Sequence, residues 1–260
     1  MDQTAFSGTI EPSTFVHASR VPLTDQNMET SLHRQLKDLY AIADAQLEAP
    51  LEGYRIDVLT ADQVVEIQHG SLAAIRDKVA KLVKRHQVVV VKPIVIRKRL
   101  VRQDAKAGRV LSRRLSPKKG SIWDIFHELV YFTRVFPHKN LILDVPLVDI
   151  EEWRYPGHGR RRRWRRNDFQ VEDQKLTCVH KTQRFRNGPD LAKLIPPGLP
   201  KPFHTGHLAE HLDLPRWIAQ RIAYCLREMR ITEDLGKAGN ARLYSLPSQR
   251  VRRSRRRDAA

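Results

Sequence analysis

Hydrophobic and polar positions follow two different periods in the first third of the chain. Between residues 26 and 47 apolar residues recur every three or four positions, which predicts a helix. The segments 53–60 and 62–70 each alternate apolar and polar residues and meet at a short turn near Ala61–Asp62. This alternation is typical of a β-hairpin with one buried face.

The following segments predict a helical crossover into a buried strand. Residues 71–86 return to helical spacing behind Ser71, a favourable N-cap. Residues 87–95 form a continuous apolar, β-branched run, as in strands buried on both faces. The order helix, strand, strand, helix, strand (α-β-β-α-β) therefore indicates an α/β fold with a mixed sheet and a right-handed crossover into its last strand.

The middle of the chain is more basic and less regular. Residues 95–117 predict a second hairpin, which turns near residues 105–108, while 121–136 have helical spacing and 141–153 read as another strand. Residues 154–200 are first rich in arginine and then in proline, and we expect an irregular linker there.

A second, small α+β unit is predicted over residues 201–247. Thr205 is a natural N-cap for a short helix, and Pro215 stands where a longer helix would begin. Four apolar residues line the inner face of that helix: Ile218, Ile222, Leu226 and Met229. Two short strands with a glycine-containing turn follow. The remaining parts are an expected disordered leader over 1–25, an α/β domain over 26–153 and a disordered basic tail over 248–260.

Charge makes a polyanion the expected partner. The 260 residues carry a net charge of +18, with an isoelectric point near 10.3. Residues 92–119 contain eleven lysines and arginines, 154–166 contain seven arginines, and 248–260 contain six. Positive charge gathered in blocks is typical of proteins that bind a phosphate backbone. Two cysteines and the absence of any apolar run of about 20 residues lead us to expect a cytoplasmic or nucleoid-associated protein with no membrane contact.

Two acidic residues of the first hairpin are the strongest candidates for chemistry. A turn at Ala61–Asp62 pairs Leu59 with Val64 and places Asp57 opposite Glu66. Like charges directly opposite each other destabilise a hairpin, and a divalent cation between them would remove the repulsion. The alternative is a hairpin without a metal site, whose acidic side chains are exposed to solvent.

Glu29 on the first helix, Asp57 on a strand and Glu66-Ile67-Gln68 on the paired strand together resemble the PD-(D/E)XK, or restriction-endonuclease-like, nuclease family. The resemblance covers roughly residues 26–96. It implies that Asp57, Glu66 and the carbonyl of Ile67 bind Mg²⁺ or Mn²⁺, and that Glu29 supports a metal-bound water.

The third position of the tripeptide departs from the family pattern, because Gln68 stands where a lysine is usual. A glutamine side chain can orient a water molecule but cannot supply a positive charge or act as a general base. Lys78, on the helix that follows, is a candidate to extend toward the site instead. Both Gln68 and Lys78 are therefore included among the expected catalytic residues.

The small C-terminal unit resembles a winged helix-turn-helix over its whole length. The resemblance implies a recognition helix over 215–230 and a two-stranded wing. The residues expected to contact DNA are those of the recognition helix and wing, Arg216, Gln220, Arg221, Arg227, Lys237 and Arg242, and those of the basic blocks, Arg97, Arg99, Arg113, Arg114, Arg162 and Arg163.

The sequence thus favours a Mg²⁺-dependent DNA endonuclease targeted by a winged helix. The competing hypothesis is a DNA-binding or regulatory protein whose nuclease core is inactive. RNA as the nucleic acid and a homodimeric state stay open.

Overall fold

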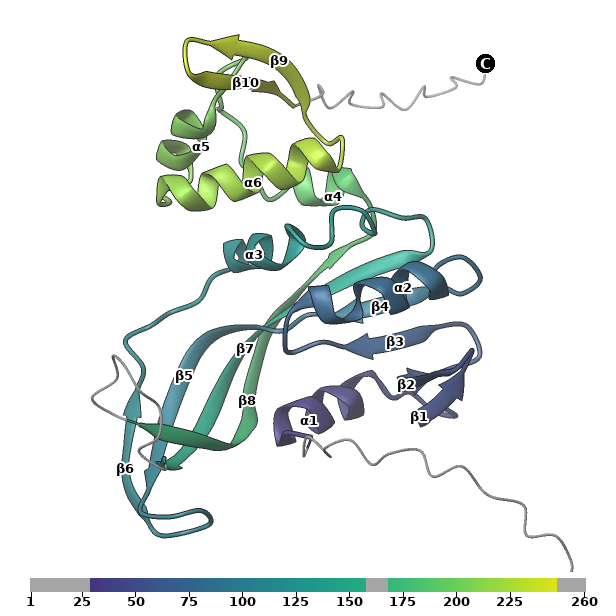
Figure 1. Ribbon diagram of the computed structural model, residues 1–260, viewed down its shortest axis with the longest axis vertical. Coiled ribbons are helices and arrows are strands. Elements are labelled where there is room, and N and C mark those ends of the chain that lie inside the picture. The colour runs from purple at the N-terminus through teal and green to yellow at the C-terminus, as the bar shows by residue number, and fades with distance from the viewer. Residues whose placement is uncertain (1–28, 158–167, 247–260) are drawn as a thin grey trace, which may run out of the picture.

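The computed structural model describes residues 29–157 and 168–246, which form a large mixed sheet, its covering helices and a small C-terminal unit (Figure 1). The first part of the chain contains α1 (Ser31–Tyr40), β1 (Gln46–Leu51), β2 (Tyr54–Leu59), β3 (Val64–Ile67), a 3₁₀ turn (Leu72–Ile75), α2 (Arg76–Leu82) and β4 (Val88–Val91). The order is helix, three strands, helix, strand, so the structure has one more strand than the sequence pattern predicted.

The sheet has eight strands and extends over two connected halves. The later strands are β5 (Ile94–Gln103), β6 (Val110–Leu115), β7 (Leu141–Pro156) and β8 (Phe169–Phe185). Their order is β1-β2-β3-β4-β7-β5-β6, with β8 paired to the free side of β7. β3, β4 and β7 are parallel neighbours, whereas β1–β2–β3, β5–β6 and β7–β8 are antiparallel. The mixed α/β architecture is therefore confirmed.

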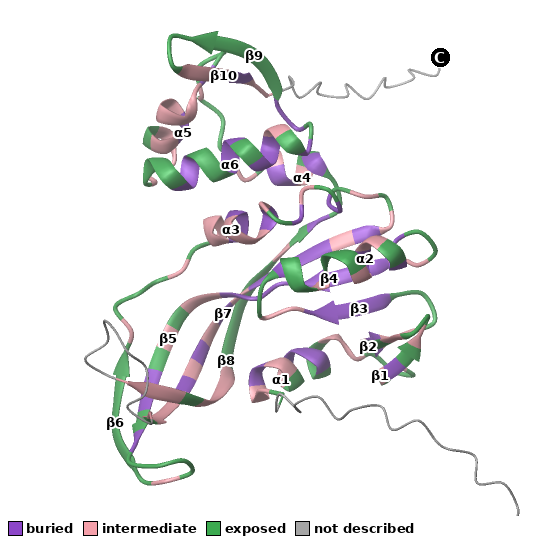
Figure 2. Cartoon of the chain, viewed as in Figure 1, coloured by how far each residue is buried: buried purple, intermediate pink, exposed green. Residues whose placement is uncertain are grey.

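β4 and β5 replace the single buried strand expected over residues 87–95. Both strands pair with β7 in parallel, β4 along Leu141–Asp144 and β5 from Leu147 onward. Lys92 and Pro93 separate them, because proline cannot donate a ladder hydrogen bond. β4 is fully buried, as its run of four valines predicted (Figure 2).

The two faces of the sheet are covered by different helices. α1 packs on one face, where Leu32 and Leu36 meet Val65, Val89 and other buried residues of the strands. α2 and α3 (Ile125–Leu129) pack on the opposite face, in a core that continues into the C-terminal unit. The lower halves of β5 to β8 extend beyond these helices (Figure 1).

The first helix is shorter than predicted. Thr30 caps α1, and its side-chain oxygen accepts from the backbone N–H of His33. The helix ends at Tyr40, and the backbone of Asp44 is left-handed, with φ of 66°. Leu47, which belonged to the predicted helix, is instead on β1 opposite Val58. Pro50 is tolerated in β1 because this strand lies at the edge of the sheet.

The expectation of an irregular linker over residues 154–200 was wrong for most of its length. β7 continues to Pro156, and Phe169–Phe185 form β8, the longest strand. The ladder between the two strands shifts register at three places, which interrupts the alternation that would have revealed β8 in the sequence. α4 (Gly188–Ala192) follows β8 directly.

The C-terminal unit has the predicted elements: α5 (Thr205–His211), α6 (Arg216–Glu228), β9 (Glu233–Ala238) and β10 (Ala241–Ser245). His204 caps α5 in place of Thr205, with its ring Nδ1 accepting from the N–H groups of Gly206 and His207. All four predicted inward residues of α6 are buried. The helical segment expected over 121–136 is mostly turns around the five-residue α3.

Candidate functional site

The β2–β3 hairpin has the predicted register at its turn, where Leu59 pairs with Val64 and Val58 with Val65. The pairing stops before Asp57 and Glu66. Ile56 belongs to the core beneath α2 and α3, whereas Val58 belongs to the core beneath α1. The single apolar face expected for Ile56 and Val58 is therefore wrong, because β2 changes orientation at Asp57 and turns this carboxylate toward α1.

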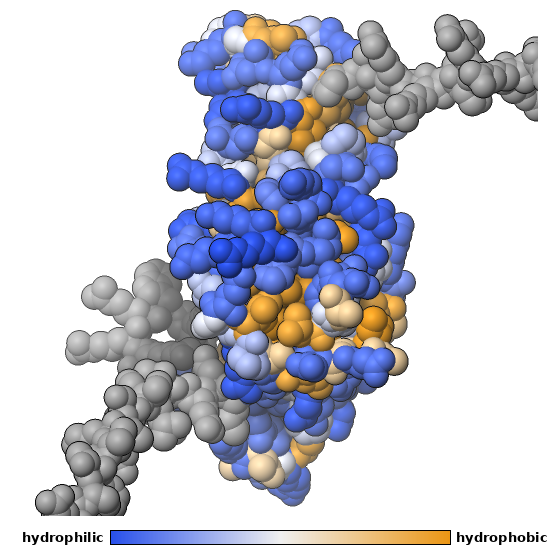
Figure 3. All heavy atoms as spheres, turned by 90° about the vertical axis from the view of Figure 1, so that its right-hand side faces the viewer, coloured by the Kyte–Doolittle hydropathy of each residue, from blue (hydrophilic) through white to orange (hydrophobic). Residues whose placement is uncertain are grey.

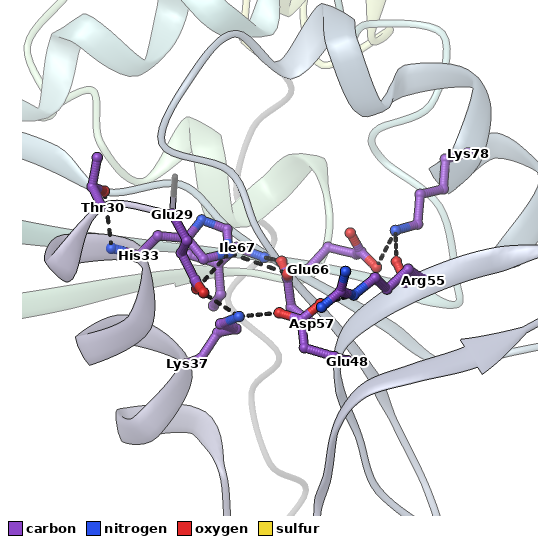
Figure 4. A network of polar contacts seen from close by, with 10 residues as sticks. All are labelled: Glu29, Thr30, His33, Lys37, Glu48, Arg55, Asp57, Glu66, Ile67 and Lys78. Atoms are coloured by element: carbon purple, nitrogen blue, oxygen red, sulfur yellow. Dashed lines mark hydrogen bonds and ion pairs between the residues drawn. The ribbon is translucent and has the colours of Figure 1, made fainter. Parts of the chain in front are cut away.

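Asp57 is held by α1 and by β3 (Figure 4). Its Oδ1 lies 3.1 Å from His33 Nε2, and its Oδ2 accepts from the backbone N–H of Ile67 at 2.7 Å. Burial by itself raises the pKa of Asp57, but these two hydrogen bonds outweigh it and lower the pKa below the ordinary value. Asp57 is therefore ionised at neutral pH.

Glu66 lies beside Asp57 but contacts α2. Lys78 Nζ approaches Glu66 Oε1 to 2.6 Å and also donates to the Arg55 carbonyl at 2.5 Å. Glu66 is almost fully buried, and this burial raises its pKa to about 7, with a further contribution from the charge of Asp57 and an opposing one from Lys78. Neighbouring carboxyl groups whose pKa values are driven apart are characteristic of catalytic and metal-binding sites.

The structure thus brings Asp57, Glu66 and Lys78 into one cluster, and Glu29 extends it. Glu29 was predicted to lie on the first helix, but it precedes the N-cap Thr30 and lies outside α1. Lys37 Nζ lies 2.5 Å from Glu29 and also contacts Glu48, while His33 lies 3.7 Å from Glu29 (Figure 4). His33 and Lys37 were missed in the sequence. The signal was present, since Glu29, His33 and Lys37 are spaced four residues apart, and His33 and Lys37 share one face of α1.

Gln68 does not join the acidic cluster. Its amide nitrogen donates to the carbonyl of Ser71 at 2.8 Å, so it fastens the loop after β3. The buried Lys92 supports the same loop by donating to the carbonyls of His69 and Gly70. Burial and the charge of Lys92 lower the pKa of His69 to about 4, so this histidine is neutral. Only Lys78 brings a side-chain cation to Glu66 in the described residues.

The donor atoms of this cluster suit a hard divalent cation. Mg²⁺ prefers oxygen ligands and commonly uses one or two carboxylates while it keeps several waters. Asp57 and Glu66 would hold such an ion together with the carbonyl of Ile67. Within residues 29–157 and 168–246, no group of three or more His, Cys, Asp or Glu side chains is placed to form an all-protein metal site. Metal binding would therefore share Asp57 with His33, and Glu66 with Lys78.

The basic hairpin predicted over 95–117 is β5–β6, and part of its charge is paired. Arg99 and Arg113 flank Glu151 at 3.6 and 3.5 Å, and Lys98 lies 2.5 Å from the buried Glu152. Arg97 and Arg114 are exposed, which is the condition for contact with phosphate. Arg162 and Arg163 lie outside the described residues. The side of the molecule shown in Figure 3 is largely hydrophilic, with separate apolar patches.

The predicted recognition helix is only partly free. Arg221 contacts His127 of α3, and Trp217 stacks on the same ring at 5.1 Å between centroids. Arg227 pairs with Glu228 at 2.7 Å. Arg216 and Gln220 are exposed on the same helix. In the β9–β10 hairpin, which was predicted to be a wing, Lys237 is exposed and Arg242 pairs with Asp234.

Comparison with known proteins gives a family for this fold. The family model described as a domain of unknown function (DUF8091) matches residues 30–186. This chain belongs to the DUF8091 family. The DUF8091 match ends directly after β8, so it includes α1, the whole eight-stranded sheet and the Asp57–Glu66 cluster, and it leaves out α5 and α6.

One relative matches most of the chain. An uncharacterized protein of Treponema pallidum (strain Nichols) is 32% identical over 183 residues, which cover 70% of this chain and 72% of the relative. No solved structure matches. Among the helices that the structure describes, none has the length and apolar character to cross a membrane.

Proposed function

We propose that this chain is a divalent-metal-dependent endonuclease of the restriction-endonuclease-like class that acts on DNA. The observation that carries the proposal is the carboxylate pair. Asp57, with its lowered pKa, and Glu66, with a pKa of about 7, lie on adjacent strands of a helix–three-strand–helix–strand unit. This unit contains the predicted order of helix, strand, strand, helix and strand with β1 added, and Glu29 directly precedes the N-cap of α1. Both features support the resemblance to PD-(D/E)XK nucleases.

A bound Mg²⁺ or Mn²⁺ would lower the pKa of a water and neutralise charge on the phosphate. The protein's own residues have separate tasks. Asp57 and Glu66 would hold the ion, while His33 and the Ile67 N–H keep Asp57 ionised and oriented. Lys78 supplies the cation that Gln68 cannot, because it alone reaches Glu66 from α2 among the described side chains. Gln68 holds the loop after β3 in place by donating to the carbonyl of Ser71.

The C-terminal unit and the basic hairpin would bind the nucleic acid. Arg216 and Gln220 on α6, Lys237 on the wing and Arg97 and Arg114 on β5–β6 are exposed. Phosphate contacts from such residues position a duplex, whereas contacts to base edges select a sequence. RNA binding and a homodimer are compatible with the same surfaces.

A plasmid-nicking assay tests the proposal. The wild-type protein should convert supercoiled plasmid to nicked or linear DNA with Mg²⁺ or Mn²⁺ and should be inactive with EDTA. Asp57→Asn and Glu66→Gln should each reduce cleavage at least about a hundredfold, since metal-ion catalysis contributes several kcal/mol to the transition state. Lys78→Met should also reduce it, and Gln68→Lys should retain or increase it.

The matched control is Asp62→Asn, which removes the same charge from the exposed turn of the same hairpin. It should leave cleavage unchanged. Equal activity of the wild type and the Asp57→Asn, Glu66→Gln double variant would contradict the proposal and indicate a contaminant.

One observation favours a second candidate, a DNA-binding protein with an inactive nuclease core. Asp57 and Glu66 are already engaged by His33 and Lys78, and the tripeptide lysine is replaced by Gln68. DNA binding by the wild type without cleavage in either metal would establish this second function.

A further inference from the structure

A second cluster of reactive side chains lies on the sheet face opposite α1. Cys178 and His180 are two residues apart on β8, and Asp149 on β7 is the cross-strand partner of Cys178. Val148 and Ile150, on either side of Asp149, are buried in the core beneath α1, so Asp149 faces away from that helix. The cluster is therefore separate from Asp57 and Glu66.

The three side chains stand in the order of a nucleophile, a base and an orienting carboxylate. Cys178 Sγ lies 4.0 Å from His180 Nδ1, and His180 Nε2 lies 3.0 Å from Asp149 Oδ1. In such an arrangement the carboxylate orients the ring, and Nδ1 is placed to accept the proton of the thiol. Cys178 is exposed and His180 is 39% exposed, so a solute has direct access.

We propose that Cys178 is a modification site that exchanges with low-molecular-weight disulfides. The thiol proton moves to His180 Nδ1, and the Cys178 thiolate attacks one sulfur of the disulfide. A new disulfide forms at Cys178 as the original sulfur–sulfur bond breaks, and the other half leaves as a thiolate that takes up a proton. The small disulfide is the oxidant, and each bond that forms replaces one that breaks.

The surroundings of Cys178 carry positive charge. Arg97 of β5 is the partner of Asp149 on the other side of β7, and Lys181 follows His180 as an exposed cation. Nearby positive charge favours thiolate formation. The other cysteine has the opposite environment. Cys225 is buried in the core, its Sγ is 3.9 Å from the Phe126 carbonyl, and burial raises its pKa to about 12.

The test measures the rate at which Cys178 reacts with the uncharged disulfide dithiodipyridine at pH 7, in a Cys225→Ser background. The matched control carries Cys178→Ser and Thr177→Cys, which moves the thiol by one residue to the exposed position that precedes Cys178 on β8. An ordinary thiol is only a few per cent ionised at pH 7, but a more stable thiolate is a weaker nucleophile. We therefore expect Cys178 to react about three- to tenfold faster than the control.

His180→Gln and Asp149→Asn separate activation from mere exposure. His180→Gln should reduce the rate to that of the Thr177→Cys control, and Asp149→Asn should give an intermediate rate. Neither should change the rate of the control thiol, and circular dichroism should show an unchanged fold. Mass spectrometry after incubation with oxidised glutathione should find the adduct on Cys178. A Cys178 that reacts no faster than the control, or whose rate is independent of His180 in a folded protein, would overturn the proposal.

Discussion

Removal of Arg184 should expose how strongly the fold depends on one buried charge. Asp144 on β7 is completely buried, and Arg184 on β8 binds it with two hydrogen bonds, at 2.7 and 2.6 Å. The hydroxyl of Tyr40 at the end of α1 lies 3.3 Å from the same carboxylate. The pair thus joins the centre of the sheet to its last strand and to α1.

The magnitude follows from what remains after the change. Loss of one partner of a buried ion pair costs about 3–5 kcal/mol, because the other charge stays buried. Arg184 is 46% exposed, so water enters its place in part, and Tyr40 still donates to Asp144. We therefore expect Arg184→Met to lower the free energy of unfolding by about 2–3 kcal/mol. The double variant with Asp144→Asn has no buried charge and should recover at least about 1 kcal/mol of this loss.

Urea denaturation followed by circular dichroism measures these differences at constant pH. Arg186→Met is the matched control, since Arg186 is exposed just beyond β8 and a surface change of this kind costs about 0.5 kcal/mol or less. The reasoning fails if Arg184→Met is no more destabilising than Arg186→Met. It also fails if the double variant loses the full sum of the two single changes.

Three further predictions concern Glu66, the basic β5–β6 hairpin and α6. The pKa of Glu66 is raised in the folded state from an ordinary 4.5 to about 7, so its contribution to stability is present below pH 4.5 and is lost as pH rises through 7. Between pH 4.5 and pH 7 the wild type should therefore lose about 3 kcal/mol of unfolding free energy relative to Glu66→Gln, and its melting temperature should fall accordingly. A difference in melting temperature between the two proteins that stays constant over this pH range would contradict the prediction. Arg97→Ala with Arg114→Ala should weaken binding to all DNA and reduce the salt slope by up to about 0.9 for each phosphate that is no longer neutralised. Arg216→Ala with Gln220→Ala should instead reduce discrimination between preferred and random DNA. If the Arg97/Arg114 and Arg216/Gln220 double variants changed the salt slope equally, the assignment of phosphate contacts to the hairpin and base contacts to α6 would be refuted.

The parts of the fold that the sequence predicted are those with a strong local period. The β2–β3 turn, the buried β4, the β5–β6 hairpin and the inner face of α6 each follow from spacing alone. β8 could not be predicted in this way, because its bulges against β7 disturb the alternation and most of its residues between Thr177 and Thr182 are exposed. β1 was hidden because Leu47 continues the apolar spacing of α1 beyond the point where the helix ends.

The candidate site was predictable in part: Asp57, Glu66 and Lys78 were named from the sequence, whereas Gln68 lies outside the cluster and His33 and Lys37 were missed. Register placed Asp57 opposite Glu66, and the position of Lys78 on the following helix suggested its reach. The reorientation of β2 at Asp57 was not visible, because it depends on how Glu48 sits opposite it, with a left-handed φ of 54°. The attachment of Gln68 to Ser71 was equally hidden, since it follows from the shape of the loop.

The docking of α6 on α3 limits how the proposed activities can work together. Ile222, Cys225 and Leu226 share one continuous core with Phe126 and Phe132, so the C-terminal unit is packed against the rest of the protein. A winged helix attached by a loose linker would let its target site and the cut site vary in separation. Packing of this kind keeps Arg216 and Gln220 at a constant distance from Asp57 and Glu66. Under the proposed function, cleavage should therefore occur at a fixed offset from any sequence that α6 selects, within the same binding event.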